Sequence, residues 1–183
     1  MRHISGLNFR VSHAVTGCAE PLFRQICPER PSSLLLAGAV GSGKTTMLRD
    51  LCRLLGASWR LTLVDERSEI AAVHHGVPQY DVGLHTDVLD GFPRAEGLLT
   101  ALRVLTPEVL VCDEISTEAD AQAILRIHGS GVPVVASAHG TSLEDLERRP
   151  ALKQLLDKGV FRYAAVLSGR EQGKVQTLRR VVP

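Results

Sequence analysis

Short apolar runs alternate with stretches of helical periodicity along most of the chain. The apolar runs are continuous, which is typical of parallel strands that are buried on both faces. Strands that alternate with helices predict a parallel α/β sheet with right-handed crossovers and helices on both faces. The expected strands are 31–38, 59–65, 108–114 and 132–138, and the expected helices are 44–55, 93–105, 118–128, 142–149 and 151–159.

The rest of the chain carries other patterns. Apolar and polar residues alternate over 6–11, which predicts an edge strand, and a short helix is expected over 18–26. Two strand patterns at 161–169 and 174–182 predict a C-terminal β-hairpin. Residues 71–92 hold glycines, a proline and few regular signals, so we expect a long connection, which is usually functional.

Length and composition limit both the domain count and the partners. The chain has 183 residues, of which 44% are hydrophobic and 22% charged, as in one globular domain. We assign that domain to residues 32–183 and interpret residues 1–31 as an N-terminal strand and linker segment of a longer protein. The formal net charge of +1 favours neither nucleic acid nor a membrane surface as a partner. No apolar run reaches the ~18–20 residues that span a bilayer, so we expect a cytoplasmic protein that meets membranes only peripherally.

The segment GAVGSGKTT, residues 38–46, fits the phosphate-binding pattern G-x-x-x-x-G-K-T. It lies between an expected strand and an expected helix, which is the context that this pattern requires. Lys44 is placed for the β- and γ-phosphates and Thr45 for Mg²⁺. We expect ATP, because the single asparagine, Asn8, precedes the loop and the guanine-reading N-K-x-D element is therefore absent. The expected phosphate-binding residues are Gly38, Ala39, Val40, Gly41, Ser42, Gly43, Lys44, Thr45 and Thr46.

Two of the expected strands end in a pair of carboxylates. Asp113 is in the position of a Walker B aspartate, which holds Mg²⁺, and Glu114 is placed to activate the attacking water as a general base. Asp65 and Glu66 end an earlier strand. We interpret them as a second acidic wall of the same site, in which Glu66 is the alternative base. The other interpretation of this pair is a salt bridge with Arg67.

A histidine, His139, follows the expected strand at 132–138. In P-loop folds of the hydrolytic branch, we expect this strand to lie between the strand before the P-loop and the strand that ends in Asp113. The strand at 59–65 is then expected outside the latter. This order would project His139 between the P-loop and Asp113, where an imidazole can hydrogen-bond the γ-phosphate and respond to its loss. His139 is therefore a candidate γ-phosphate sensor.

The P-loop and the segments VDERSEI, VCDEI and SAHGTS form an ordered set along the chain. The set resembles the secretion ATPases of type II and type IV systems and the pilus motors. Their Asp box matches Asp65 and Glu66. Their Walker B motif matches Asp113 and Glu114, and their His box matches His139. The resemblance implies a RecA-like ATPase that uses ATP and Mg²⁺.

Over residues 4–167 the chain resembles still more closely the stage III sporulation protein AA family of spore-forming bacteria. Besides the motifs above, the segments GVPQ, TDVLD and RPALKQL carry this resemblance. It implies the C-terminal ATPase domain of a mother-cell protein, at the base of the channel that links mother cell and forespore, with an N-terminal domain missing. It also implies a homo-oligomer, in the form of a hexameric ring, and partners among the membrane components of that channel.

A positive charge must offset the transition state of phosphoryl transfer, and an arginine of a neighbouring subunit commonly supplies it. Arg67, Arg103 and Arg162 are the candidates, in falling order. The secretion ATPases follow their Walker B motif with an arginine, where this chain has Ser116. Two other functions are left open: a small-molecule P-loop kinase, and a nucleotide-dependent assembly module with little turnover.

Overall fold

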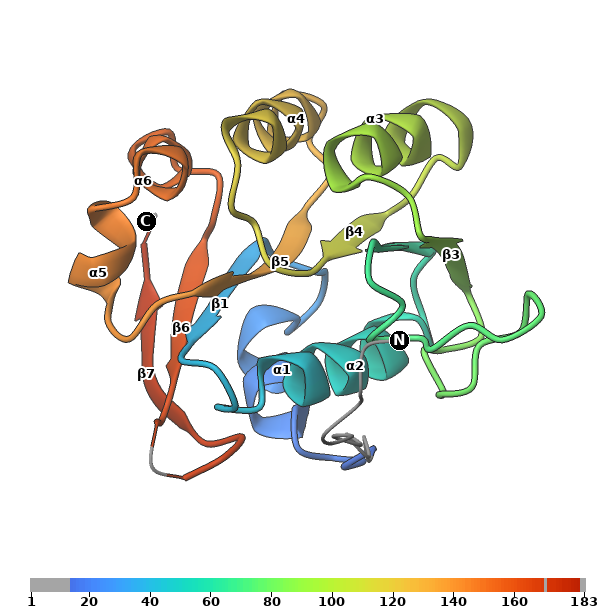
Figure 1. Cartoon of the computed structure of the whole chain (residues 1–183), viewed down its shortest axis with the longest axis horizontal. Helices are drawn as coiled ribbons and strands as arrows, with labels where there is room; N and C mark the ends of the chain where they lie inside the picture. Colours follow the sequence, from blue (N-terminus) through green and yellow to red (C-terminus); the bar gives the residue numbers. More distant parts are fainter. Residues whose placement is uncertain (1–13, 170, 182–183) are drawn as a thin grey trace, which may run out of the picture.

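The computed structural model describes residues 14–169 and 171–181. Its strands are β1 (Leu34–Gly38), β2 (Leu61–Asp65), β3 (Thr86–Asp90), β4 (Val109–Cys112), β5 (Val134–His139), β6 (Tyr163–Leu167) and β7 (Val175–Arg180). They form one sheet through the middle of the molecule (Figure 1). All neighbouring strands are parallel except β6 and β7, which pair as an antiparallel hairpin.

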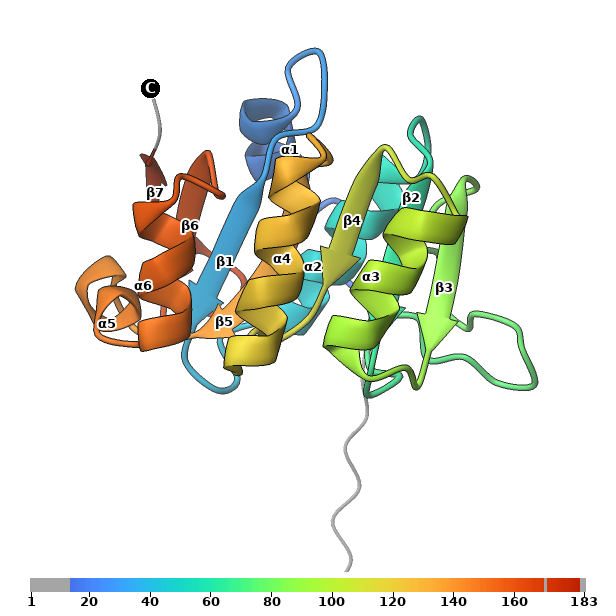
Figure 2. The same ribbon diagram turned by 90° about the horizontal axis from the view of Figure 1, so that it is seen from above.

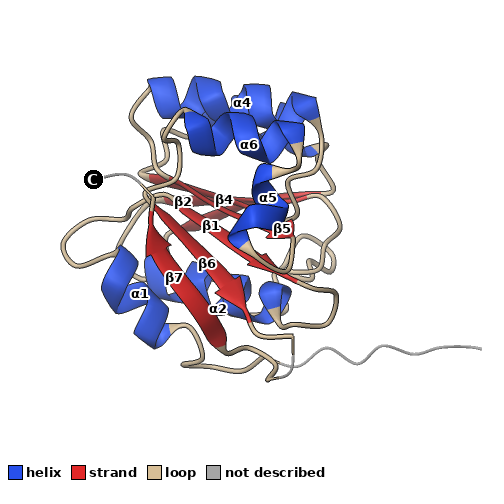
Figure 3. Cartoon of the chain, turned by 90° about the vertical axis from the view of Figure 1, so that its left-hand side faces the viewer, coloured by secondary structure: helices blue, strands red, loops and turns tan. Residues whose placement is uncertain are grey.

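The helices are α1 (Glu20–Ile26), α2 (Lys44–Leu55), α3 (Arg94–Val104), α4 (Glu118–Gly129), α5 (Leu143–Glu147) and α6 (Pro150–Asp157). Helices α4 and α6 lie on one face of the sheet, with α3 beside them, and α1 and α2 lie on the other (Figures 1 and 3). None of these described helices is long and apolar enough to cross a membrane. The predicted parallel α/β sheet, with helices on both faces and a C-terminal hairpin, is confirmed.

A separate apolar core lies on each face of the sheet. Leu98 of α3, Ile124 of α4 and Leu155 of α6 are fully buried on one face. Ile26 of α1 and Leu51 of α2 are fully buried on the other. Because α1 belongs to this second core, residues 20–26 pack as part of the sheet domain. The predicted boundary at residue 31 stays a prediction.

The strands follow the order β3-β2-β4-β5-β1-β6-β7 across the sheet (Figure 2). The predicted order is confirmed, because β5 lies between β1 and β4, and β2 lies outside β4. The predicted edge strand at 6–11 falls outside the described residues.

Strand β3 corrects the expectation that residues 71–92 are irregular. It pairs parallel with β2, so that Leu61 lies opposite Thr86 and Asp65 opposite Asp90. Its side chains are mostly half-buried and include two aspartates, which are disfavoured in strands. Pairing with β2 outweighs this weak local preference.

The parallel register brings the carboxyl ends of the strands to one edge of the sheet. Gly38 at the end of β1 lies opposite His139 at the end of β5. Val64 of β2 lies opposite Cys112 of β4, so the residues that follow them, Asp65 and Asp113, lie at the same edge. In open α/β sheets, ligands bind at this edge.

Candidate nucleotide-binding and hydrolytic site

The loop between β1 and α2 has the backbone of a phosphate cradle. Gly41 and Gly43 have φ of 76° and 96°, a region that side chains disfavour. A Cβ atom on Gly38 would overlap the hydroxyl of Ser42. That hydroxyl is buried and has no hydrogen-bond partner among the described residues, so it is available to a ligand. The loop therefore fits a bound phosphate chain, with the amino end of α2 behind it.

Lys44 folds back onto this loop. Its Nζ donates hydrogen bonds to the carbonyl oxygens of Gly38 and Ala39, at 2.8 and 2.9 Å. Burial lowers the pKa of Lys44, and the nearby carboxylate of Glu114 raises it in part. The lysine is thus held at the base of the cradle, within electrostatic reach of the residue that follows the Walker B aspartate.

The turn between β6 and β7 lies against the P-loop. The amide of Gly173 donates a hydrogen bond to the carbonyl oxygen of Ser42, at 2.8 Å. A Cβ atom on Gly43 would come within 2.9 Å of the Gly173 nitrogen. Glycine at position 43 therefore serves two needs, the positive φ and the close approach of the hairpin.

Asp113 and Glu114 directly follow β4. Asp113 is 7% exposed, and burial raises the pKa of its carboxyl group while Arg94 opposes the rise. Glu114 has a φ of 34°, which is uncommon for a residue other than glycine. Its amide donates a hydrogen bond to Oγ of Ser137 on β5, at 2.9 Å, which holds the turn against the neighbouring strand. Strained backbone of this kind concentrates at functional sites.

Glu66 and Arg67 each form an ion pair across the site. Oε2 of Glu66 lies 2.7 Å from Nη2 of Arg94, and Nη1 of Arg67 lies 2.8 Å from Oε2 of Glu114. Both members of the Arg67 pair are more than a third exposed, whereas Arg94 is buried. Among the described residues Arg67 pairs with Glu114 and Glu66 pairs with Arg94, so the alternative interpretation of Arg67 as the salt-bridge partner of Asp65 and Glu66 is wrong.

Asp65 is bonded to the backbone of the loop that follows it. Its carboxylate accepts hydrogen bonds from the amides of Glu69, Ile70 and Ala71, at 2.9 to 3.0 Å. It is fully buried, and this burial raises the pKa of the carboxyl group, although the three amides favour its ionised form. Asp65 thus shapes the loop that carries Glu66, and its charge adds to burial in raising the pKa of Asp113. The second acidic wall stays a prediction.

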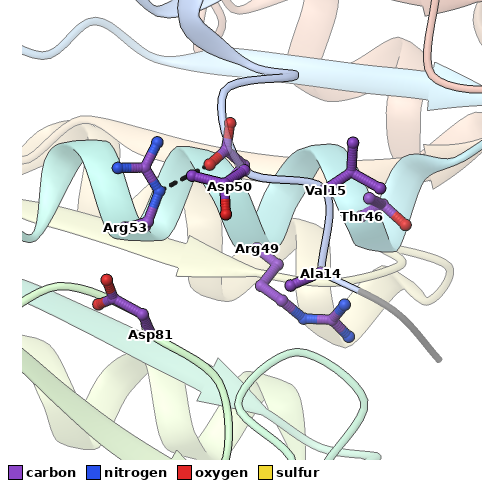
Figure 4. A pocket seen from close by; sticks show the side chains of 8 residues that line it. Ala14, Val15, Thr46, Arg49, Asp50, Arg53 and Asp81 are labelled. Carbon is purple, nitrogen blue, oxygen red and sulfur yellow. Dashed lines mark hydrogen bonds and ion pairs between the residues drawn. The ribbon is translucent and has the colours of Figure 1, made fainter.

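The helix after the P-loop, α2, also holds the loop that follows β2. The guanidinium of Arg49 donates to the carbonyl oxygens of Glu69 and Ile70, at 2.6 and 2.8 Å. Figure 4 shows Arg49 leaving α2 in a different direction from Asp50 and Arg53, which bond each other at 2.7 Å. Arg49 therefore links the P-loop helix to the loop that presents Glu66 and Arg67.

The remaining predicted residues lie at different distances from this cluster. His139 is half-buried at the end of β5, and the next amide, of Gly140, bonds the carbonyl oxygen of Gly38 at 3.3 Å. Arg103 is exposed in the last turn of α3, where it bonds the carbonyl oxygen of Leu99. At 1.5 Å per residue, it lies roughly 13 Å along the helix from Arg94, toward the amino ends of the parallel strands. Its action on a neighbouring subunit stays a prediction.

Sequence reasoning missed Arg94, which contacts both Glu66 and Asp113. One signal was present. A basic residue in the first turn of a helix opposes the helix dipole, so such a residue is usually held by other groups. Arg94 follows Pro93 at the start of the helix after β3, which places it at the carboxyl edge.

A parallel sheet with a P-loop after β1, an acidic pair after β4, and β5 between them defines the P-loop NTPase fold. The chain belongs to the family described as sporulation stage III, protein AA, whose model matches residues 1–180. It is 40% identical to stage III sporulation protein AA of Bacillus subtilis (strain 168), over 97% of this chain and 60% of that protein. It is 30% identical to the protein SEEDLING PLASTID DEVELOPMENT 1 of Arabidopsis thaliana, over 98% of this chain and 26% of that protein. The chain thus spans less than two thirds of these relatives.

Solved structures share the fold. The VirB11 ATPase from the type IV secretion system of Brucella suis superposes with a TM-score of 0.65 at 20% identity, over 87% of this chain and 50% of that chain. The ATPase DotB of Legionella pneumophila gives a TM-score of 0.62 at 20% identity, over 80% of this chain and 43% of that chain. The predicted RecA-like fold of the secretion ATPases is confirmed.

Proposed function

We propose that this chain is the ATPase domain of a secretion-type motor, which hydrolyses ATP to ADP and phosphate. The observation that carries the proposal is the meeting of two parts at one sheet edge. The glycine cradle with Lys44 stands at the end of β1, and Asp113 and Glu114 stand at the end of β4, with only β5 between them. Burial lowers the pKa of Lys44 and the carboxylate of Glu114 raises it in part, which agrees with this arrangement.

The residues of the cradle fit a nucleotide with its metal ion. The amides of residues 38–46 and the Nζ of Lys44 would hold the phosphates, and Lys44 would exchange its two carbonyl bonds for phosphate oxygens. Thr45 and Asp113 would hold Mg²⁺, which when bound neutralises phosphate charge and orients the γ-phosphate. Asp113, as a buried carboxylate, has the oxygen ligands that this ion prefers.

Glu114 is the proposed general base. Its carboxylate is partly exposed, is aimed by a strained turn and is paired with the exposed Arg67, whereas Glu66 is bonded to the buried Arg94. Glu114 would take the proton of the attacking water. Glu66 is the second candidate. His139, which the β1–β5 register places beside the end of the P-loop strand, would donate a hydrogen bond to the γ-phosphate and respond to its loss.

A neighbouring subunit would complete the site. Arg67 is the first candidate for the arginine that offsets transition-state charge, because it is exposed and lies beside Glu114. Arg103, on the exposed end of α3, is the second. In this scheme Arg67 leaves Glu114 of its own subunit when it acts on its neighbour. We propose a homo-oligomeric ring, a hexamer by the resemblance to secretion ATPases.

Family membership supports a role in sporulation. We propose that the ring works in the cytoplasm of the mother cell, peripherally associated with membrane components of the channel to the forespore. No nucleic acid is expected as a partner, since the net charge is +1. The motor would convert hydrolysis into movement of those components.

A second candidate function is a nucleotide-dependent assembly module with little turnover. The Arg67–Glu114 ion pair favours it, because a carboxylate bonded to a guanidinium is a weaker base toward water. In the isolated chain this pair would keep hydrolysis slow until another subunit draws Arg67 away.

Phosphate release under multiple turnover, without any acceptor, tests the proposal. We expect release that rises more than linearly with chain concentration, with Lys44→Ala as the inactive control. Release only with an added small molecule would identify a kinase. Binding of ATP without release at any concentration would favour the assembly module. The mass in solution, measured with and without ATP and Mg²⁺, tests the ring.

A further inference from the structure

Arg94 is a buried arginine to which the proposed hydrolytic scheme gives no task. It is the first residue of α3, and only 5% of its surface is exposed. A positive side chain at the amino end of a helix opposes the helix dipole. A buried charge is also unfavourable unless other groups pair with it. The position of Arg94 therefore depends on its partners.

Three carboxylates from three segments surround its guanidinium. Nη2 lies 2.7 Å from Oε2 of Glu66 and 3.4 Å from Oδ1 of Asp113. Nη1 lies 3.1 Å from Oδ2 of Asp120, in the first turn of α4. One side chain thus joins the loop after β2, the end of β4 and the start of α4. A guanidinium can do this because its donors point in several fixed directions, whereas a lysine has a single nitrogen.

These contacts enclose Glu114 from both sides. Asp113 precedes it in the chain. Residues 116 and 117 follow Glu114, and their amides donate hydrogen bonds to Asp120, at 3.1 and 3.0 Å. The φ of 34° at Glu114 is one that a non-glycine residue keeps only where its surroundings hold it. Arg94 binds the groups that fix both ends of this turn.

We propose that Arg94 is a positioning residue for hydrolysis. It holds Asp113 in the orientation that Mg²⁺ requires, and it fixes the turn that aims Glu114 at the attacking water. Glu66 then serves as an anchor of Arg94. The inference rests on the proposed ATPase function and deepens it, because Arg94 acts through Asp113 and Glu114.

The test compares Arg94→Lys and Arg94→Met with the wild-type chain. Four quantities are measured. They are the thermal unfolding midpoint, kcat and KM for ATP with Mg²⁺ in excess, and the Mg²⁺ concentration that gives half of the full increase in fluorescent-ATP binding. Arg53→Met is the matched control. It removes an arginine with an equally short bond, 2.7 Å to Asp50, in the last turn of α2, away from the P-loop.

We expect Arg94→Lys to fold, with KM for ATP near the wild-type value and kcat lowered ~10–100-fold, the range typical of residues that orient a metal ligand. The half-saturating Mg²⁺ concentration is expected to rise ~10-fold for the same reason. Arg94→Met is expected to show a larger fall in kcat and a larger rise in the half-saturating Mg²⁺ concentration. Arg53→Met is expected to change neither quantity.

Wild-type kcat and an unchanged Mg²⁺ requirement in Arg94→Lys would overturn the proposal. A loss confined to stability, with kcat per folded molecule intact, would do the same. If Arg94→Met does not fold, the lysine variant decides, since it keeps a positive charge among the three carboxylates. A wild-type chain that binds ATP with Mg²⁺ and does not hydrolyse it refutes the proposed function, while the Mg²⁺ requirement still decides the role of Arg94.

Discussion

Replacement of Glu114 by glutamine tests the choice of general base. Glutamine keeps the length and shape of the side chain but cannot accept the proton of the attacking water. Because Asp113, Lys44 and the P-loop are unchanged, we expect the variant to bind ATP with Mg²⁺ as the wild type does. Hydrolysis is the step that should fail.

The size of the effect follows from the role and from the surroundings. Loss of a positioned base lowers a rate by roughly 10²- to 10⁴-fold, which is about 3–5 kcal/mol of transition-state free energy. Stability should hardly change, because the side chains of Arg67 and Glu114 are 58% and 39% exposed. Exposed pairs of this kind contribute at most about 1 kcal/mol, or ~2–4 °C in the unfolding midpoint of a chain of this size.

Glu66→Gln is the matched variant, since it removes one charge at the same sheet edge. It leaves Arg94 bonded to Asp113 and Asp120, so we expect less than a tenfold loss in kcat through disturbed positioning. The assay is phosphate release at saturating ATP and Mg²⁺, together with binding of a fluorescent ATP analogue. Equal, mild losses in the two variants would refute both assignments, and a larger loss in Glu66→Gln would exchange them.

Three further outcomes are expected. Lys44→Ala removes one charge-assisted phosphate contact, so we expect an ATP affinity lower by about 2 kcal/mol, or roughly thirty-fold in Kd by titration calorimetry. Arg67→Gln mixed with Glu114→Gln is expected to recover part of the hydrolysis that each lacks alone, because a mixed ring pairs an intact base with an intact arginine of the neighbour; no recovery would place the action of Arg67 within its own subunit. Gly43→Ala introduces a side chain at a φ of 96°, 2.9 Å from Gly173, and is expected to lose about 1–2 kcal/mol of stability in urea unfolding, whereas the control Gly129→Ala meets open space and is expected to lose none.

The sequence predicts well what depends on the ends of strands. Apolar runs, the P-loop pattern and the position of Asp113 follow from local chemistry, and one rule of strand order then brings them to one edge. His139 is the best example, because its place opposite Gly38 depends only on β5 lying beside β1. β3 escapes this reasoning, since a short, half-exposed strand forms through its neighbour rather than through its own residues.

The pairing of side chains could not be predicted in the same way. Asp65 and Glu66 are neighbours in sequence, yet one binds the amides of its own loop and the other binds Arg94. Which partner each carboxylate bonds depends on the direction of its side chain and on burial, and motif spacing contains no information on either. Arg94 itself carries no motif, and only its unfavourable place at a helix start marks it.

The two ion pairs of the loop after β2 differ in how firmly they hold. Glu66 is bonded to Arg94, whose guanidinium is buried and bonded twice more, so moving Glu66 would leave a buried charge with fewer partners. Arg67 is bonded to Glu114 in an exposed pair that contributes at most about 1 kcal/mol. The backbone of the loop is fixed by hydrogen bonds to Asp65 and Arg49. Arg67 is therefore the part of this loop that can leave the site at little energetic cost. Its departure frees Glu114, the proposed general base, without disturbing the groups that hold Asp113.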